Sequence, residues 1–510
     1  MAKRLLLLTN QDRGEANVFL ATARALLDQD ATLEIHFATF SGLEGDVSSI
    51  SNRESNHHGS GDANPVVFHQ IEGPSMRDCL DIYLEESKTP RDGIGTLPKS
   101  FSEPLRFRAT LNAIRDATPI YVPFTRHDAS LVILSVIDII ERVDADLVVV
   151  DTLMTSALTA LYHLRVPFLC LSPNSIREFA GTSQPIGHWI RKPALFSGYS
   201  HPVPWHLVPA NLFFLCYAVY KFSSNSHIRL VEEHMQTKHE MKLRTPLDLF
   251  INRPPGLRIL VSSLPELDFP LVIPPHVTPC GPILLKSGPI ISQDPAMQSW
   301  LSKGYTIYVN MGSLYVWDEE GACEFARALA QVLRKTVPQV QVLWKLPMGS
   351  SSEKASYSDK VSKLLGEFLR LDRVKIVSWI KADATSLFAT GRVLCSVHHG
   401  GANSFNEAVC AGVPQVILPQ WTDCYDYAQK VQFLGIGRIG NLTAKPRWIA
   451  NELASEILAI FQGDEAGKIK DAAARLAATC EKHGDGAVNA ATIILQQVKG
   501  QGRLDPDTFF

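Results

Sequence analysis

The chain has 510 residues, enough for about two to four domains of ordinary size. Apolar residues make up 45% and charged residues 20% of it, as is typical of a soluble globular protein. Since 49 basic and 52 acidic residues leave a net charge of −3, the chain as a whole has no field that would attract nucleic acid or an anionic membrane. These values argue against a nucleic-acid-binding protein.

Cysteine use and the apolar stretches indicate the compartment. The nine cysteines are irregularly spaced and include no Cys-x-x-Cys pair, which favours reduced thiols over disulfides or a zinc site. Four leucines at 5–8 are too few for the core of a signal peptide and predict a first strand. The apolar stretch 207–220 is too short to span a bilayer. We therefore expect a cytoplasmic protein without a transmembrane segment.

Short apolar runs alternate with helical patterns along the first half. They predict strands at residues 4–9, 33–39, 146–150 and 166–171 of a parallel sheet that is buried on both faces. Residues 41–65 are polar and predict a loop. Residues 183–245 break the rhythm with scattered Pro, Trp and Phe, followed by a polar, helix-like stretch at 227–241. This irregular insertion fits a wall beside an apolar ligand and ordinary packing about equally well.

A Pro-rich stretch after this half predicts a connection between domains. The strand and helix rhythm then restarts, with strands predicted at 305–311, 341–346, 374–378, 393–397 and 414–418. The sequence therefore predicts two doubly wound α/β halves whose strand ends face a ligand-binding cleft. We place the boundaries at 1–250, 251–290 for the linker, 291–480, and 481–510 for a C-terminal helix and tail.

The densest pattern for chemistry lies at residues 396–421. A strand leads into His398, His399, Gly400 and Gly401, and a helix that begins at Asn403 or Ser404 follows. Glycines allow close backbone approach and a helix N-terminus offers free N–H groups, so the pattern predicts a phosphate or diphosphate site. Two other interpretations remain. Ser404 and Glu407 have the spacing of a capping box, and the two histidines could bind zinc.

The wider pattern resembles the donor signature of the UDP-dependent glycosyltransferases of family 1. It runs from Trp379 through His399-x-Gly401-x-Asn403-Ser404-x-x-Glu407 and Gly412-Val413-Pro414 to Pro419-x-x-x-Asp423. Residues 14–18 and 425–427 are similar to the fungal branch. The resemblance implies a GT-B fold, in which two Rossmann-like domains bind acceptor and donor. It also implies inverting transfer with a UDP-sugar as co-substrate and no metal or other cofactor.

The resemblance also implies roles for residues of the nucleotide site. Trp379 would stack on uracil, and Glu407 would accept hydrogen bonds from the ribose hydroxyls. His399 would contact the diphosphate, and Ser313 would lie near the phosphates. Backbone N–H groups would hold phosphate oxygens at Gly401, Asn403 and Ser404.

The sugar site resembles the family with one departure. Asp423 would bind the sugar hydroxyls, and Trp421 would border the sugar and the acceptor. Plant-type members have a glutamine where this chain has Cys424, and a thiol is a weak hydrogen-bonding group. We therefore expect UDP-glucose only because it is the commonest donor of the family.

The catalytic position also departs from the family. Most members carry a histidine base oriented by an aspartate; Asp151 occupies the aspartate position, but Glu15 occupies that of the histidine. Glu15 could be the base, or a first-turn residue that complements the helix dipole. The dipole would lower its pKa, whereas burial and Asp151 would raise it.

Together these features predict a metal-independent, inverting UDP-glycosyltransferase of secondary metabolism. It would form a β-glycoside on a small apolar acceptor, such as a phenolic or polyketide-like metabolite. Transfer to carbon or nitrogen is an alternative. Another alternative is a catalytically silent protein that binds UDP-sugar or a partner. The missing histidine is the only sequence feature that favours it. A UDP-sugar epimerase of the same fold is a further alternative.

Overall fold

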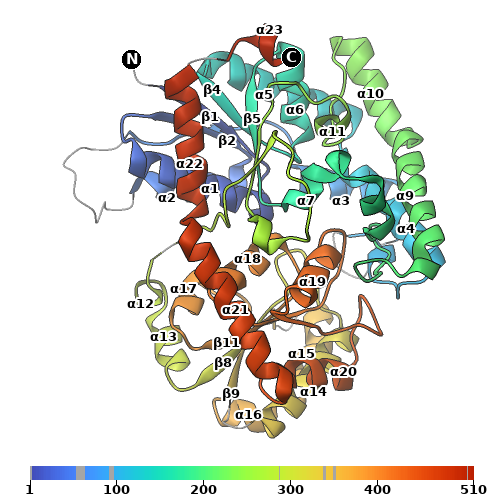
Figure 1. Cartoon of the computed structure of the whole chain (residues 1–510), viewed down its shortest axis with the longest axis vertical. Coiled ribbons are helices and arrows are strands. Elements are labelled where there is room, and N and C mark those ends of the chain that lie inside the picture. The colour runs from blue at the N-terminus through green and yellow to red at the C-terminus, as the bar shows by residue number, and fades with distance from the viewer. Residues whose placement is uncertain are drawn as a thin grey trace.

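A computed structural model describes residues 3–52, 64–90, 97–286, 288–336, 340–348, 352–501 and 504–510. It contains two domains, one above the other in Figure 1, each built on a parallel sheet. The first domain has the strand order β3-β2-β1-β4-β5-β6-β7, and the second has β10-β9-β8-β11-β12-β13. The predicted architecture of two doubly wound α/β halves is confirmed.

The central strands of the first sheet are buried on both faces. Leu6 and Leu8 of β1 lie in one apolar core, and Leu5 and Leu7 lie in the core on the other face, which explains the unbroken apolar run. The strands are β1 (Arg4–Leu8), β2 (Glu34–Thr39), β3 (Val67–Gln70), β4 (Leu147–Asp151), β5 (Phe168–Ser172), β6 (Ile259–Val261) and β7 (Val277–Pro279).

The sequence analysis missed β3, β6 and β7. The last two lie inside the stretch 251–290, which was predicted to be a linker, so most of that stretch belongs to the first domain. Its prolines hid the strands because they flank β6 and occur in β7, a three-residue strand at the sheet edge, where proline is tolerated.

The second sheet follows the predicted strands closely and adds one at its edge. Its strands are β8 (Tyr305–Asn310), β9 (Val340–Lys345), β10 (Val374–Val377), β11 (Val393–His398), β12 (Gln415–Ile417) and β13 (Gly437–Ile439). Helices of the second domain include α14 (Glu319–Lys335), α17 (Ala384–Ala389), α18 (Ala402–Cys410), α19 (Cys424–Phe433), α20 (Ala450–Leu458) and α21 (Asp464–His483).

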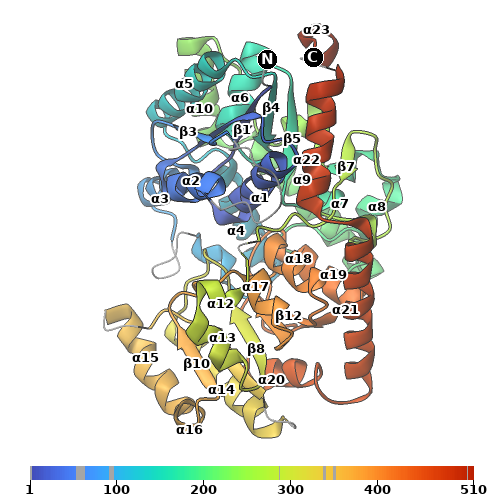
Figure 2. The same ribbon diagram turned by 90° about the vertical axis from the view of Figure 1, so that its left-hand side faces the viewer.

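The C-terminal helix returns to the first domain. In Figures 1 and 2, α21 and α22 (Gly486–Gln496) run along one side of both domains, and α22 lies beside α1 (Arg13–Gln29). Ala490 and Ile494 of α22 share a core with Val18 and Phe19 of α1. The crossing needs a glycine, because a Cβ at Gly486 would lie 2.4 Å from the Pro282 carbonyl oxygen.

The insertion at 183–245 is largely helical and contains α8 (Ile186–Arg191), α9 (Val208–Ser223) and α10 (Ser226–His239). Helix α10 confirms the helix-like stretch predicted at 227–241, whereas α8 and α9 correct the prediction of irregular structure before it. Part of the predicted loop 41–65 is also helical, as α2 (Glu44–Asn52), and its residues 53–63 lie outside the described residues. The other helices are α3 (Met76–Glu86), α4 (Phe107–Ala117), α5 (Arg126–Val143), α6 (Thr155–Leu164), α7 (Ile176–Ala180), α11 (Asp248–Ile251), α12 (Ile290–Gln293), α13 (Pro295–Leu301), α15 (Ser352–Leu364), α16 (Gly366–Arg370) and α23 (Pro506–Phe509).

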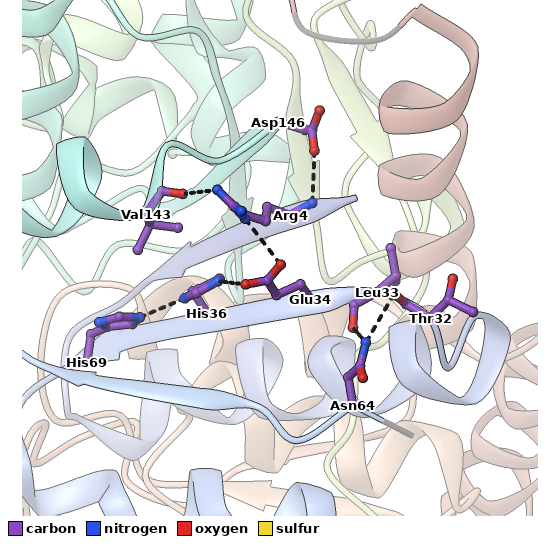
Figure 3. A network of polar contacts seen from close by, with 9 residues as sticks. All are labelled: Arg4, Thr32, Leu33, Glu34, His36, Asn64, His69, Val143 and Asp146. Carbon is purple, nitrogen blue, oxygen red and sulfur yellow. Dashed lines mark hydrogen bonds and ion pairs between the residues drawn. The ribbon is translucent and has the colours of Figure 1, made fainter. Parts of the chain in front are cut away.

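A polar network ties together β1, β2 and β3 (Figure 3). The Arg4 side chain donates to Glu34 at 3.1 Å, and His36 lies 3.1 Å from Glu34 and 2.7 Å from His69. Burial and neighbouring positive charge lower the pKa of His69 to about 4. Because Arg4 and Glu34 begin their strands, the network is anchored at the amino end of the sheet. We assign these histidines a structural role.

No single helix within the described ranges combines the length and the apolar composition needed to cross a bilayer. The segments Phe107–Tyr121 and Arg126–Val143, bent by 47° to each other, meet both criteria only when taken as a pair.

Candidate active site

The two adjacent histidines after β11 have different environments. The Gly400 N–H donates to His398 Nδ1 at 3.1 Å, and His398 Nε2 lies 2.8 Å from the side-chain oxygen of Gln415, so this ring supports the loop. His399 Nδ1 is buried without a hydrogen-bond partner among the described residues. No cluster of three or more His, Cys, Asp and Glu in the described ranges could hold a metal ion. The zinc-pair interpretation therefore has no support from the geometry.

Glycines on two loops confine the His399 ring. A Cβ at Gly401 would lie 2.6 Å from His399 Nε2, and a Cβ at Gly312 would lie 2.6 Å from His399 Cε1. Gly312 precedes Ser313 in the loop after β8, and Ser313 is exposed there. Burial, with the charges of His398 and Lys345, lowers the pKa of His399 to about 3. The ring is therefore neutral and can donate one hydrogen bond.

The helix after this loop begins earlier than predicted. α18 starts at Ala402 with Gly401 as its N-cap and has no side-chain cap hydrogen bond. Ser404 and Glu407 thus lie inside the helix, and the capping-box interpretation is wrong. The first-turn N–H groups, including those of Asn403 and Ser404, have no side-chain cap, as an anion site requires.

Trp379 offers an open aromatic face beside Lys345. It follows β10 and is 65% exposed, an unusual exposure for a tryptophan. The ammonium of Lys345, at the end of β9, lies 4.3 Å from the ring centroid, and burial lowers the pKa of this lysine. The sequence analysis missed Lys345. Its signal was a basic residue at the carboxyl end of an otherwise apolar strand.

Glu407 lies on α18 in a buried environment. Burial and then the Asp383 charge raise the pKa of Glu407 to about 8. Hydroxyl groups that donate hydrogen bonds to this carboxyl would stabilise its ionised form.

The loop before α19 carries Trp421 and Asp423, and it places Trp421 close to His399. The Trp421 ring centroid lies 5.4 Å from that of His399. The Thr422 hydroxyl donates to the Asp423 carboxylate at 2.8 Å, and Thr422 has a φ of 24°, a strained value for a β-branched residue. Burial raises the pKa of Asp423. Strain at this loop is consistent with a functional site.

Cys424 is fully buried at the start of α19. A Cβ at Gly400 would lie 2.8 Å from the Cys424 carbonyl oxygen, so the two loops pack closely there. Burial also raises the pKa of the thiol. The thiol is thus part of the packing beneath the loop.

Glu15 and Asp151 meet at the carboxyl end of the first sheet. Asp151 ends β4, is fully buried, and accepts from the Leu153 N–H at 2.9 Å and the Thr9 hydroxyl at 3.3 Å. Glu15 lies in the first turn of α1, close to the side chains of Asp151 and Asn10, and its buried Oε2 atom has no hydrogen-bond partner in the described ranges.

The electrostatics of this pair favour Glu15 as the base over a residue that complements the helix dipole, and its role stays a prediction. Burial, followed by the charges of Asp151 and Asp12, raises the pKa of Glu15 well above its usual range, and burial also raises that of Asp151. The helix dipole, which would lower the pKa of Glu15, does not dominate. Two buried carboxyls this close hold a proton between them more readily than two charges.

Asn403 joins the two halves of the site. Its side-chain amide donates to the carbonyl oxygens of Arg13 and Gly14, each at 3.2 Å. The start of α18 therefore contacts the backbone that leads into Glu15. Sequence spacing could not reveal this contact, because about 390 residues separate the partners.

A buried ion pair holds α19 against the first domain. The guanidinium of Arg177, on α7, lies 3.1 Å from the Asp426 carboxylate, and Lys430 lies 3.2 Å from Asp268. Breaking one member of such a pair is costly because it leaves an uncompensated buried charge. The sequence analysis singled out Asp426 within 425–427 but missed Arg177, Lys430 and Asp268, since no local pattern marks them.

Comparisons with known proteins agree with this geometry. Residues 371–483 match the family described as Erythromycin biosynthesis protein CIII-like, C-terminal domain. The chain is 33% identical over 456 residues to Glycosyltransferase sdnJ of Sordaria araneosa, covering 86% of this chain and 84% of that one. The chain belongs to the family 1 UDP-glycosyltransferases.

Two further relatives support this assignment. UDP-glycosyltransferase stmC of Aspergillus ustus is 26% identical over 271 residues, covering 48% of this chain and 50% of that one. A solved UDP-glucosyltransferase from Polygonum tinctorium superposes with a TM-score of 0.60 at 15% identity, covering 97% of this chain and 98% of that one. The GT-B fold predicted for the transferase is confirmed.

The family assignment settles the class of activity. The protein is a glycosyltransferase enzyme that uses a UDP-sugar donor. The alternatives of a catalytically silent protein and an epimerase are therefore set aside. The individual roles of the site residues stay predictions.

Proposed function

We propose that this transferase moves the sugar of UDP-glucose to a small apolar acceptor, with inversion at C1 and without a metal ion. The observation that carries the proposal is the contact of Asn403 with the backbone beside Glu15. The hydrogen bonds of Asn403 thus connect the diphosphate site proposed at α18 with the backbone beside the proposed base.

Groups around α18 support the proposed donor site. His399, held neutral, can donate to the diphosphate, and Lys345 adds positive charge beside it. The first-turn N–H groups of α18 point a partial positive charge at the same place. Since these groups can offset the charge that grows on departing UDP, metal independence is part of the proposal.

Glu15 is the proposed base for the transfer step. The acceptor oxygen forms a bond to C1 while the bond from C1 to the UDP oxygen breaks, and its electron pair leaves with UDP from the opposite face. The Glu15 carboxylate takes the hydroxyl proton. Its raised pKa makes it a stronger base than a solvated glutamate, and Asp151 contributes to that rise.

A buried aromatic cluster supports an apolar acceptor. Phe101, Phe196 and Phe214 of the first domain form one cluster with Tyr425, and Trp421 packs against it. A phenolic or polyketide-like metabolite of secondary metabolism has matching chemistry, because flat apolar rings pack well on aromatic side chains. A cytoplasmic location stays a prediction from the sequence.

Product analysis of the purified full-length enzyme tests the proposal. We expect hexose adducts on phenolic acceptors by mass spectrometry, with UDP released only when an acceptor is present and with activity retained in EDTA. The anomeric coupling in the NMR spectrum should identify a β-linkage, and the linkage atom would reveal C- or N-transfer. An α-linked product, or loss of activity in EDTA, would contradict the proposal.

Asp423→Ala tests the sugar site separately. If Asp423 binds the sugar hydroxyls, turnover should fall about 10- to 100-fold, as for the loss of hydrogen bonds to a charged group. Affinity for UDP alone, measured by calorimetry, should stay nearly unchanged because UDP lacks the transferred hexose. Cys424→Ser is the matched control, since this buried thiol packs beneath the loop. Equal losses of UDP affinity and turnover in Asp423→Ala would mean that Asp423 only supports the loop.

A further inference from the structure

The outer face of α9 is apolar along its whole length. Its exposed residues recur at spacings of three and four: Pro209, Leu212, Phe213, Cys216, Val219 and Tyr220. Asn211 and Phe214 face the interior. A helix that is apolar on all sides is normally buried, yet α9 lies at an outer edge of the first domain (Figure 1). No other part of the described chain covers this face.

Neighbouring residues extend the apolar face beyond the helix. Trp205, four residues before Pro209, is 85% exposed, and Val219 is 71% exposed. On the adjacent α4, the Phe107 ring stacks on Phe213 with centroids 5.6 Å apart. At about 1.5 Å per residue, the stripe from Trp205 to Tyr220 is about 20 Å long. An exposed apolar surface of this size marks an interaction site.

Basic groups outnumber acidic ones around this face, where Glu103 and Asp116 both lie near Arg115. Exposed Arg106 and Arg108 flank Phe107, and the Lys221 ammonium lies 5.7 Å from the Tyr220 ring centroid. Residues 179–231 contain no Asp or Glu, although the chain has 52 acidic residues in 510. Asp116 of α4 is paired with Arg115 at 2.7 Å. The net charge of −3 thus hides a local basic region.

We propose that the α9 face, defined as Trp205, the exposed stripe of α9 and Phe107, docks on an anionic lipid bilayer. Exposed tryptophan and phenylalanine enter the interfacial zone of a membrane, while arginine and lysine remain at the level of the lipid phosphates. Such binding is peripheral. A second copy of the chain would instead require acidic groups opposite the arginines, and none lie within the segment 179–231.

The inner side of the same helix connects the α9 face to the active site. Phe214 belongs to the aromatic cluster that contains Tyr425 and packs against Trp421. α9 therefore separates the docking face from the region proposed for the acceptor. An acceptor dissolved in the bilayer would then be close to that region. This extension rests on the proposed function, whereas docking itself does not.

Flotation of the full-length protein with vesicles tests the docking. We expect binding to vesicles of phosphatidylcholine with about 30% phosphatidylserine, weak binding to phosphatidylcholine alone, and weakening with added salt. Phe213→Ser with Val219→Ser should lower the partition coefficient by about tenfold or more. Arg106→Gln with Arg108→Gln should lower it by about 25-fold on anionic vesicles only.

Ile291→Ser is the matched control, because Ile291 is 62% exposed but lies on α12 of the second domain. It should bind vesicles like the wild type. Trp205→Ser, outside the helix, provides a second test if the α9 variants fail to fold. UDP affinity in solution should be unchanged in all variants, which separates this test from the proposed function. Absence of vesicle binding, or a dimer that the same substitutions disperse, would overturn the proposal.

Discussion

The donor side and the catalytic side of this site are built on different physical grounds. On the donor side, His399 is confined by Gly312 and Gly401, and its ring is neutral at any ordinary pH. On the catalytic side, Glu15 and Asp151 are two buried carboxyls whose charges oppose each other. The donor side depends on the steric confinement of a neutral ring, and the catalytic side depends on the protonation state of two carboxyls. Transfer should therefore depend on pH more strongly than donor binding, in which Glu407 would exchange only a fraction of one proton.

The largest effect should come from Glu15→Gln, which keeps the shape of the side chain but removes the proton acceptor. We expect kcat to fall about 10²- to 10⁴-fold on an alcohol acceptor, with UDP affinity unchanged. The loss should shrink for acidic phenols, because an acceptor that is already ionised needs less help. Steady-state kinetics over acceptors of graded pKa measures this. Equal rates for the variant and the wild type on the least acidic acceptor would remove Glu15 from catalysis.

The shape-based side can be tested with a double-mutant cycle. His399→Ala should weaken UDP binding by about 1.5–3 kcal/mol, or roughly 10- to 150-fold. Gly401→Ala should also weaken it, because its Cβ would meet the His399 ring, whereas its φ of −69° suits alanine. In the double variant the ring is absent, so calorimetry should find the affinity of His399→Ala alone. Additive losses would show that Gly401 acts independently of the ring.

The proton-based side predicts a shift in the pH profile. Glu15 is a base only when ionised, so kcat/KM should rise as pH passes its raised pKa. Asp151→Asn removes a charge that raises this pKa, and the acid limb should therefore move to lower pH. Asp12→Asn should move it in the same direction by less, because the Asp12 charge contributes less. An acid limb that stays in place in both variants would contradict a carboxylate pair.

The smallest effect concerns proton release on donor binding. The pKa of Glu407 is raised to about 8, so near pH 7 this carboxyl is mostly protonated in the free enzyme. Ribose hydroxyls would favour its ionised form, and UDP binding should then release a fraction of one proton. Calorimetry in buffers of different ionisation enthalpy measures this number. Glu407→Gln should abolish the release, and an unchanged release would place its source elsewhere.

Regular elements and the donor signature were predictable because local patterns carry them. The strands around 4–8, 34–39 and 393–398 are short runs rich in apolar residues, since both faces of the sheets are buried. The short strands β6 and β7 were missed because three residues near prolines carry too little pattern. Helix α9 was noticed as an apolar stretch, but its sequence alone could not show which of its faces would be left exposed.

The sequence by itself determined the family, the alternation of strands and helices in two halves, and the residue types of the donor and catalytic positions. These follow from short-range periodicity and from a dense local signature. Only the tertiary structure decided which histidine supports the loop and which is confined by glycines, that Lys345 lies against Trp379, and that Asn403 reaches the backbone beside Glu15. The reason is physical: pKa values, steric confinement and domain contacts depend on neighbours distant in the chain, which local patterns do not record.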